Sequence, residues 1–267
     1  AEGDDALCNP DWVFLSCGSG EVFDDVVAYA VEHGYHGAEN LSIIPGEVGA
    51  SAVQNIGAYG VEAKDIIYKV EAVEIATGRV VVFDNADCEY SYRQSKFKHD
   101  WKDKYLVTHV IYRLQKTFRP DLDYGNIRAA LEAKHIAEPT AQQLRDVIIE
   151  IREAKLPDPK VLGNAGSFFM NPIVEKAKYE KLAARYPGMP HYTIDDSHEK
   201  IPAGWMIDQC GWKGKSLGRA GVHDKQALVL VNRGGATGEE IVKLCETIQE
   251  DVKQKFGIEI HPEVNVK

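Results

Sequence analysis

The chain has 267 residues, 44% hydrophobic and 27% charged, which is enough for one large or two small domains with buried cores. Its net charge of −10 argues against a nucleic-acid-binding protein, because such a protein needs a basic face. No apolar run approaches the ~18 residues of a membrane span, and no signal-peptide pattern opens the sequence, so we expect no nucleic acid and no membrane among the partners.

The first half of the chain is predicted to be mostly sheet. Residues 21–33 have the apolar spacing of a helix, and Gly34 is a good C-terminal stop. The runs at 65–75 and 79–83 flank a turn that contains a glycine, which indicates a hairpin. Strands are predicted at 12–17 (buried), 65–75, 79–83 and 105–114.

A glycine-rich stretch at 45–62, PGEVGASAVQNIGAYGVE, interrupts this sheet region. Small side chains of this kind do not predict a core. They predict a loop that lets the backbone approach a flat or phosphorylated ligand. The alternative is an irregular surface loop between two domains. A second run at 163–172, GNAGSFFMNP, favours the ligand-binding interpretation.

The second half of the chain is predicted to alternate helices and strands. Thr140 is a plausible N-cap, Asn171-Pro172 is typical of a helix start, and Thr237 with Glu240 forms a capping-box pattern. The proline-rich segment 156–160 is the expected domain boundary. Helices are predicted at 126–135, 140–155, 171–186, 205–210 and 237–256, and strands at 226–231 and 258–266. The predicted fold class is α+β.

Several common catalytic patterns are absent from the sequence. It has no P-loop, no G-x-G-x-x-G turn, no G-x-S-x-G and no H-E-x-x-H. Its five cysteines are odd in number and widely spaced without a C-x-x-C pair, so neither a disulfide framework nor a metal site is expected. These absences leave a cofactor cradle of non-Rossmann type as the sharpest hypothesis.

Five segments together resemble the UDP-N-acetylenolpyruvoylglucosamine reductase family. They are the stretch at 45–62, YRQSKFKH at 92–99, LPDPKVLGNAGSFFMNP at 156–172, GWMIDQCGWKG at 204–214 and HPEV at 261–264. The resemblance covers essentially the whole chain in order. DLDYG at 121–125 resembles the form of the family with the longer substrate loop.

The resemblance implies a vanillyl-alcohol-oxidase-type FAD-binding domain and a smaller αβ domain for a UDP-sugar. The FAD-binding domain would span 1–155 and the substrate domain 156–257, with the final strand 258–267 returning to the first domain. The implied enzyme is a monomeric, cytoplasmic bacterial flavoprotein. It uses FAD and NADPH to reduce UDP-N-acetylglucosamine enolpyruvate to UDP-N-acetylmuramate in peptidoglycan synthesis.

The resemblance also implies three catalytic residues. Arg93 matches the arginine that faces the developing enolate, and Glu263 matches its acidic partner. Ser167 matches the proton donor to the α-carbon. Outside the family context, the same residues would be a surface salt-bridge arginine, a solvated glutamate and a loop serine that bonds its own backbone.

The binding residues implied by the resemblance form two sets. The FAD site would consist of Ile44, Pro45, Gln54, Asn55, Ile56, Gly57 and Arg152. The UDP-sugar site would consist of Tyr124, Lys155, Asn171, Tyr192, Lys200, Lys213 and Gln226.

The sequence departs from the family pattern in three respects. Asn265 replaces an arginine that is usual there, and Ala50 replaces a common serine. No glycine-rich pyrophosphate loop of the family's N-terminal part is found, which suggests that this part of the FAD domain is missing. One alternative is therefore a catalytically silent UDP-sugar-binding fragment, and a weaker one is a different flavoprotein oxidase of the same fold.

Overall fold

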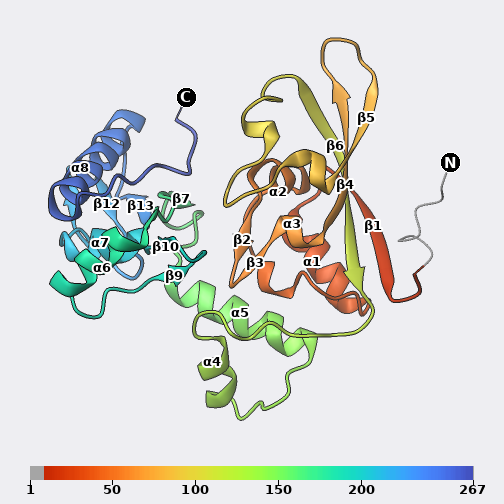
Figure 1. The fold of residues 1–267 in the computed structure, drawn as a ribbon, viewed down its shortest axis with the longest axis horizontal. Coiled ribbons are helices and arrows are strands. Elements are labelled where there is room, and N and C mark those ends of the chain that lie inside the picture. The colour runs from red at the N-terminus through yellow and green to blue at the C-terminus, as the bar shows by residue number, and fades with distance from the viewer. Residues whose placement is uncertain (1–8, 267) are drawn as a thin grey trace. The chain divides into compact units, whose positions relative to one another are not determined.

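The computed structural model describes residues 9–266 and divides into two compact units, Ala1–Arg152 and Glu153–Lys267. Both units contain helices and antiparallel sheet, which confirms the α+β class (Figure 1). The division falls inside a helix, slightly before the proline-rich segment where the boundary was expected. Among the described helices, none has the length and hydropathy needed to cross a bilayer.

The first unit is built on a four-stranded antiparallel sheet (Figure 1). The strands, in sheet order, are β1 (Trp12–Gly18), β6 (Tyr105–Gln115), β4 (Ile67–Glu74) and β5 (Val80–Asp84). The hairpin predicted from the glycine turn is the β4–β5 pair. The expected buried strand is β1, but it lies at an edge and is only half-buried.

Short helices pack on this sheet and close its core (Figure 1). Val70, Val110 and Tyr112 of the sheet are buried together with Phe23 and Val27 of the first helix. The helical elements are α1 (Phe23–Glu32), η2 (Glu39–Leu41), α2 (Val48–Gln54), α3 (Ala63–Ile66), η3 (Asn85–Cys88) and η4 (Lys96–Lys98).

The glycine-rich stretch is not the bare loop that its composition predicts. It forms α2 and a small hairpin of β2 (Gly57–Ala58) with β3 (Val61–Glu62). Val48 and Ala52 are fully buried, so the stretch does contribute to the core. Small residues serve packing here: a Cβ at Gly49 would come within 2.9 Å of the Ser19 Cβ.

A separate helical layer with its own core completes the first unit. It consists of α4 (Ile127–Ala133) and α5 (Ala141–Lys155), whose buried residues include Leu131, Leu144 and Ile148. Thr140 begins α5 as predicted, because its hydroxyl accepts the Gln143 N–H at 3.2 Å. The Gln143 side chain in turn accepts the Thr140 N–H at 2.9 Å, which makes a reciprocal cap.

The second unit combines two small antiparallel sheets with three helices. One sheet has the order β11 (Ser216–Leu217), β12 (Ala220–Val222), β13 (Val229–Asn232) and β7 (Asn164–Ser167). The other has the order β8 (Ile173–Glu175), β10 (His198–Lys200) and β9 (Tyr192–Thr193). The helices are α6 (Lys176–Arg185), α7 (Ala203–Gln209) and α8 (Gly238–Phe256).

Helix α8 has the ends that the sequence predicts. The Thr237 hydroxyl accepts the Glu240 N–H at 3.3 Å, and the Glu240 carboxylate accepts the Thr237 N–H at 2.8 Å. Gly257 ends the helix in the left-handed conformation with φ of 65°. Leu244, Ile248 and other apolar residues of α8 lie in the core of the second unit.

Two predictions for the second unit are wrong. Asn171-Pro172 does not start a helix: β8 follows it, and α6 begins only at Lys176. The segment 258–266 has one isolated bridge, Phe169 with Pro262, in place of a strand. Ile258 and Ile260 of this segment are buried in the core of the second unit. Lys267, the end of that predicted strand, lies outside the described residues.

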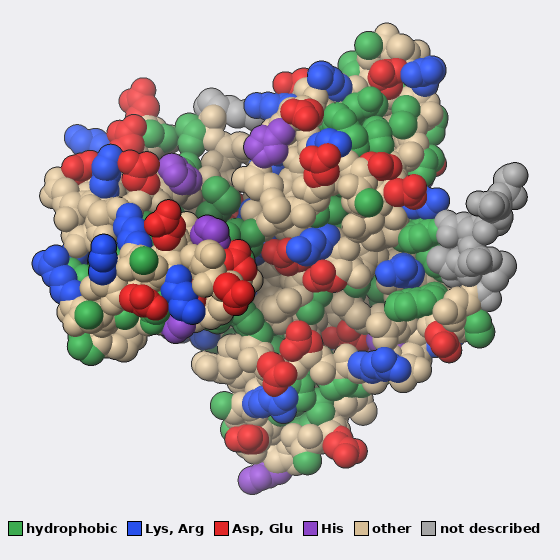
Figure 2. Space-filling view, in the orientation of Figure 1, with side chains coloured by type: hydrophobic (Ala, Val, Ile, Leu, Met, Phe, Trp, Pro, Cys, Tyr) green, Lys and Arg blue, Asp and Glu red, His purple; other side chains and the backbone are tan. Residues whose placement is uncertain are grey.

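The outer strand β5 carries exposed apolar side chains. Val80 is 63% exposed and Val82 is 53% exposed. Ile75 at the hairpin turn and Leu106 on β6 are also exposed. Hydrophobic side chains accordingly gather on the surface over this end of the sheet (Figure 2).

Candidate active site

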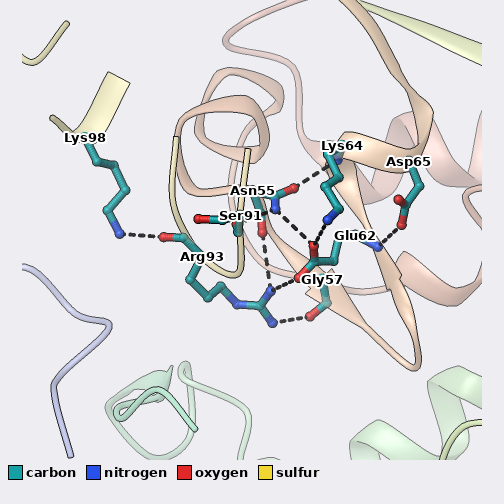
Figure 3. Close-up of polar contacts among 8 residues, drawn as sticks. All are labelled: Asn55, Gly57, Glu62, Lys64, Asp65, Ser91, Arg93 and Lys98. Atoms are coloured by element: carbon teal, nitrogen blue, oxygen red, sulfur yellow. Dashed lines mark hydrogen bonds and ion pairs between the residues drawn. The ribbon is translucent and has the colours of Figure 1, made fainter. Parts of the chain in front are cut away.

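Arg93 lies at the centre of a polar cluster in the first unit (Figure 3). Its Nη2 donates to the Gly57 carbonyl at 2.6 Å and its Nη1 to the Asn55 carbonyl at 3.3 Å. The Glu62 carboxylate is 3.8 Å from Nη1, and the Arg93 side chain is only 14% exposed. The guanidinium is thus held by the same stretch, 45–62, that was expected to contact the cofactor.

Asn55 organises this cluster from the end of α2. It is fully buried, and its φ of 48° is left-handed, a conformation that asparagine tolerates better than most residues. Its side-chain amide donates to the Ser91 carbonyl at 2.8 Å, and its Oδ1 accepts the Lys64 N–H at 2.9 Å. Asn55 therefore joins the segment that carries Arg93 to the segment after the β2–β3 hairpin (Figure 3).

Left-handed backbone recurs around this cluster. Ile43, Asn55, Tyr59 and Arg93 all have φ between 48° and 58°. Each such non-glycine residue costs about 1–3 kcal/mol, and such residues concentrate at functional sites. Gly60, with φ of 85°, completes the set of positive-φ residues in the β2–β3 turn.

Arg152 approaches the stretch 45–62 from α5. Its Nη2 is 3.5 Å from the Ile43 carbonyl, and it also hydrogen-bonds Tyr59. Burial lowers the pKa of Arg152, against the effect of Tyr59 and Asp24, and burial raises the pKa of Tyr59. The Nε of Arg152 is buried and has no hydrogen-bond partner among the described residues.

This orphaned donor provides a test of whether the residues suit FAD. A buried N–H without a partner is rare and indicates a missing acceptor. The flavin ring system offers carbonyl oxygens and ring nitrogens as acceptors. The predicted FAD residues Ile44 and Pro45 follow Ile43, whose carbonyl is near Arg152, and Gln54 and Ile56 flank Asn55 in the chain. The donor set in this unit therefore suits FAD.

The second unit brings Ser167 and Glu263 onto neighbouring segments. Ser167 is exposed at the end of β7, opposite Val229 of β13. The buried Phe168 and Phe169 that follow it anchor this end of the strand. The Glu263 N–H donates to the Phe168 carbonyl at 2.8 Å. The segments that carry Ser167 and Glu263 are therefore joined by a backbone hydrogen bond.

Asn171 and Gln226 each lie near a residue at the start of α7. The Asn171 Oδ1 accepts the Ala203 N–H at 2.9 Å, and the Gln226 Oε1 would lie 3.2 Å from a Cβ at Gly204. Asn171 thus does act at a helix N-terminus, but at that of α7 and not of the helix next in sequence.

The other predicted substrate residues are more dispersed. Tyr192 and Lys200 are cross-strand neighbours on β9 and β10, with Lys200 Nζ 5.6 Å from the ring centroid. Lys213 is exposed and lies 3.8 Å from the Asp208 carboxylate. Lys155 is exposed at the end of α5, and Tyr124 packs over Gly60 in the first unit.

Sequence reasoning missed the residues that support the predicted site. Ser91 and Lys64 hold Asn55, and Tyr59 contacts Arg152. The ion pair between Asp24 and Arg145 was also missed, although both sit on correctly predicted helices. The only sequence signal for the left-handed backbone around this site was the glycine content of the stretch 45–62, in which Gly46 and Gly60 do have positive φ.

Family comparisons match both units. The family described as "UDP-N-acetylenolpyruvoylglucosamine reductase, C-terminal domain" matches residues 158–267. The family described as "FAD binding domain" matches residues 9–84.

Individual relatives agree with this result. The chain is 58% identical over 255 residues to UDP-N-acetylenolpyruvoylglucosamine reductase of Bacteroides fragilis, covering 96% of this chain and 76% of the relative. It is 52% identical over 254 residues to that of Porphyromonas gingivalis, covering 95% of this chain and 75% of the relative. A crystal structure of the Thermus caldophilus reductase has a similar fold, with a TM-score of 0.64 at 22% identity, covering 94% of this chain and 72% of that one.

Proposed function

Because this chain belongs to the UDP-N-acetylenolpyruvoylglucosamine reductase family, we propose that it is the NADPH-dependent flavoenzyme that makes UDP-N-acetylmuramate for peptidoglycan. The observation that carries the proposal is 58% identity over 96% of the chain. The alternative of a silent UDP-sugar-binding fragment is not favoured, since the FAD-binding family also matches, over residues 9–84. We place the enzyme in the cytoplasm. The cysteines of the described residues are unpaired, as is usual in proteins of a reducing compartment.

The proposed reaction needs positive charge where an enolate develops. When bound, FAD supplies hydride transfer from NADPH to the enolpyruvyl β-carbon. Electron density then moves toward the substrate carboxylate, where Arg93 can bind the oxygens through its planar donors. Its attachment to the Gly57 and Asn55 carbonyls fixes the guanidinium before the charge appears, which is the condition for effective electrostatic stabilisation.

Ser167 is the proposed proton donor to the α-carbon, and Glu263 its neighbour. A serine hydroxyl is a weak acid, so it protonates only a strongly basic centre such as this carbanion-like carbon. The exposed position of Ser167 beside the segment of Glu263 supports this assignment. For the UDP-sugar, we propose Tyr124, Lys155, Asn171, Tyr192, Lys200, Lys213 and Gln226 as binding residues.

The substitution Ser167→Ala tests the assignment. We expect flavin reduction by NADPH to continue while turnover of the enolpyruvyl substrate falls at least about 100-fold. Stopped-flow absorbance of the flavin separates the two half-reactions. Ser197→Ala, at an exposed turn of the same unit, is the matched control and should turn over normally. Normal turnover by Ser167→Ala would remove Ser167 from the mechanism.

Colour tests the cofactor. The purified chain should be yellow and should release FAD on denaturation. A colourless chain that cannot be reconstituted with FAD contradicts the proposed function.

A further inference from the structure

Helix α5 is joined to α1 by a partly buried ion pair that the proposed chemistry does not use. We infer that Asp24 of this pair is a positioning residue for the FAD site, acting through Ile43 and Arg152. The inference rests on the proposed function, because it concerns how this chain prepares those residues for the cofactor.

One carboxylate collects three hydrogen bonds at this point. Asp24 Oδ1 accepts from Arg145 Nη1 at 2.7 Å, and Oδ2 accepts from Arg145 Nη2 at 2.9 Å. Oδ1 also accepts the backbone N–H of Ile43 at 2.6 Å. The side chains are 24% exposed for Asp24 and 9% for Arg145, so water screens the pair little. A bidentate pair of this kind fixes both distance and orientation.

The first element that Asp24 fixes is the backbone at Ile43. Ile43 has φ of 49°, which a β-branched residue adopts only when its surroundings impose it. The hydrogen bond from its N–H to Asp24 is such a constraint. The carbonyl of the same residue faces Arg152 Nη2, and the predicted FAD contacts Ile44 and Pro45 follow directly.

The second element is helix α5. Arg145 and Arg152 are about two turns apart and therefore lie on nearly the same face of the helix. Pairing of Arg145 with Asp24 fixes the rotation of α5 about its axis and its distance from α1. It thereby fixes the position of the Arg152 Cα, from which that side chain extends. The buried Nε of Arg152, which has no partner within residues 9–266, is thereby held in place for an acceptor.

A double-mutant cycle on the full chain tests the inference. The variants are Asp24→Asn, Arg152→Met and the pair, and the measurement is the FAD dissociation constant from fluorescence titration of the apoprotein. We expect Asp24→Asn to raise the constant at least tenfold in the native background and by a clearly smaller factor when Arg152 is already Met, where only the route through Ile43 remains. Asp25→Asn, the exposed neighbour on α1, should change nothing. Equal effects in both backgrounds would overturn the inference, since a general loss of stability acts independently of Arg152.

Two further measurements keep the result decisive. If Asp24→Asn does not fold, Arg145→Lys retains the charge but loses the bidentate geometry, and it should show the same dependence on Arg152. If the native chain binds no FAD, the proposed function fails, and the Nε–H resonance of Arg152 in the apoprotein decides the inference alone. That resonance should shift in Asp24→Asn and stay in Asp25→Asn; an unmoved resonance rejects the positioning role.

Discussion

Gly57 leaves the space that the Arg93 guanidinium occupies. A Cβ at this position would lie 2.9 Å from Arg93 Nη1, 2.9 Å from the Val61 carbonyl and 3.0 Å from Glu62 Cγ. The Val61 carbonyl belongs to the backbone, and the Arg93 and Glu62 side chains are themselves hydrogen-bonded, so both the hairpin and the arginine must shift. The absence of a side chain at Gly57 therefore helps to determine where the Arg93 guanidinium lies.

The substitution Gly57→Ala should consequently lower both kcat and the stability of the fold. We expect a loss of about 10- to 100-fold in kcat, because a displacement of about 1 Å misaligns the guanidinium with the enolate. Steady-state kinetics together with a thermal melt make the comparison. Gly20→Ala is the control, since nothing lies within 4 Å of a Cβ there. An unchanged kcat for Gly57→Ala would show that Arg93 tolerates displacement.

At this scale, sequence reasoning found the residues but not their conformations. The family motifs pointed to Asn55, Gly57 and Arg93, which the structure brings together. The left-handed turn at Ile43 could not be predicted, because a β-branched residue argues against positive φ. The hydrogen bond from the Ile43 N–H to Asp24 on α1 forms only in the folded chain, so no local pattern indicates it.

Among the elements, α8 is the most clearly determined by its own sequence. Both directions of its capping box are formed, and its apolar residues face the core of the second unit. The sequence predicts such a helix because every signal for it is local. Two-residue strands such as β9 and β11 have no periodicity to detect, and they were missed.

Removing the cap of α8 should destabilise the second unit. We expect Thr237→Ala to lower the free energy of unfolding by about 1 kcal/mol, because the Glu240 N–H loses its acceptor. Urea unfolding monitored by circular dichroism measures the change. Thr247→Ala, in the same helix, loses only a bond to the Lys243 carbonyl and should change stability by less than about 0.5 kcal/mol.

The contact between α1 and α5 predicts a pH dependence. Burial opposes ionisation of Asp24, but hydrogen bonds from Arg145 and Ile43, with the charges of Arg145 and Arg152, outweigh it and lower the pKa. A lowered folded-state pKa stabilises the fold above the ordinary value of 3.8, and this stabilisation is lost as pH falls through the folded-state pKa.

We therefore expect Asp24→Asn to cost about 2–3 kcal/mol at pH 7, because the buried Arg145 loses its counter-charge. The difference from the native chain should shrink once the pH is well below 3.8. Unfolding free energies measured at pH 7, 5 and 3 test this, with Asp25→Asn for comparison. A difference that stays constant down to pH 3 contradicts the assignment.

Across the whole molecule, the sequence predicts the α+β class and two units, and the structure confirms the class. Its prediction of a strand at 258–266 is wrong; that prediction arose because Ile258 and Ile260 alternate with polar residues as in a strand. In the folded chain, the Gln249 side chain donates to the Ile260 carbonyl at 2.7 Å, and Met170 N–H donates to that of His261 at 2.9 Å. The Gln249 side chain thus satisfies a carbonyl that a neighbouring strand would bond in a sheet. No local sequence pattern indicates this contact.

The cysteines of the described region are distributed over both units and are all unpaired. Burial raises the pKa of Cys17, Cys88 and Cys245 to about 11, so at pH 8 only about one such thiol in a thousand is a thiolate. Cys210 is more accessible. We expect iodoacetamide to modify Cys210 faster than the other three in the folded protein, and all equally in denaturant, as measured by peptide mass spectrometry. Fast labelling of Cys88 in the folded protein would contradict its burial.

Strand β5 has a consequence for handling the protein in solution. Its outer backbone groups have no neighbouring strand among the described residues, and Val80 and Val82 expose their side chains beside them. An edge of this kind is a template on which another extended chain can add. As the concentration rises, intermolecular strand pairing should begin at β5, and a lysine in place of Val82 should delay it. Light scattering during concentration would show the later onset.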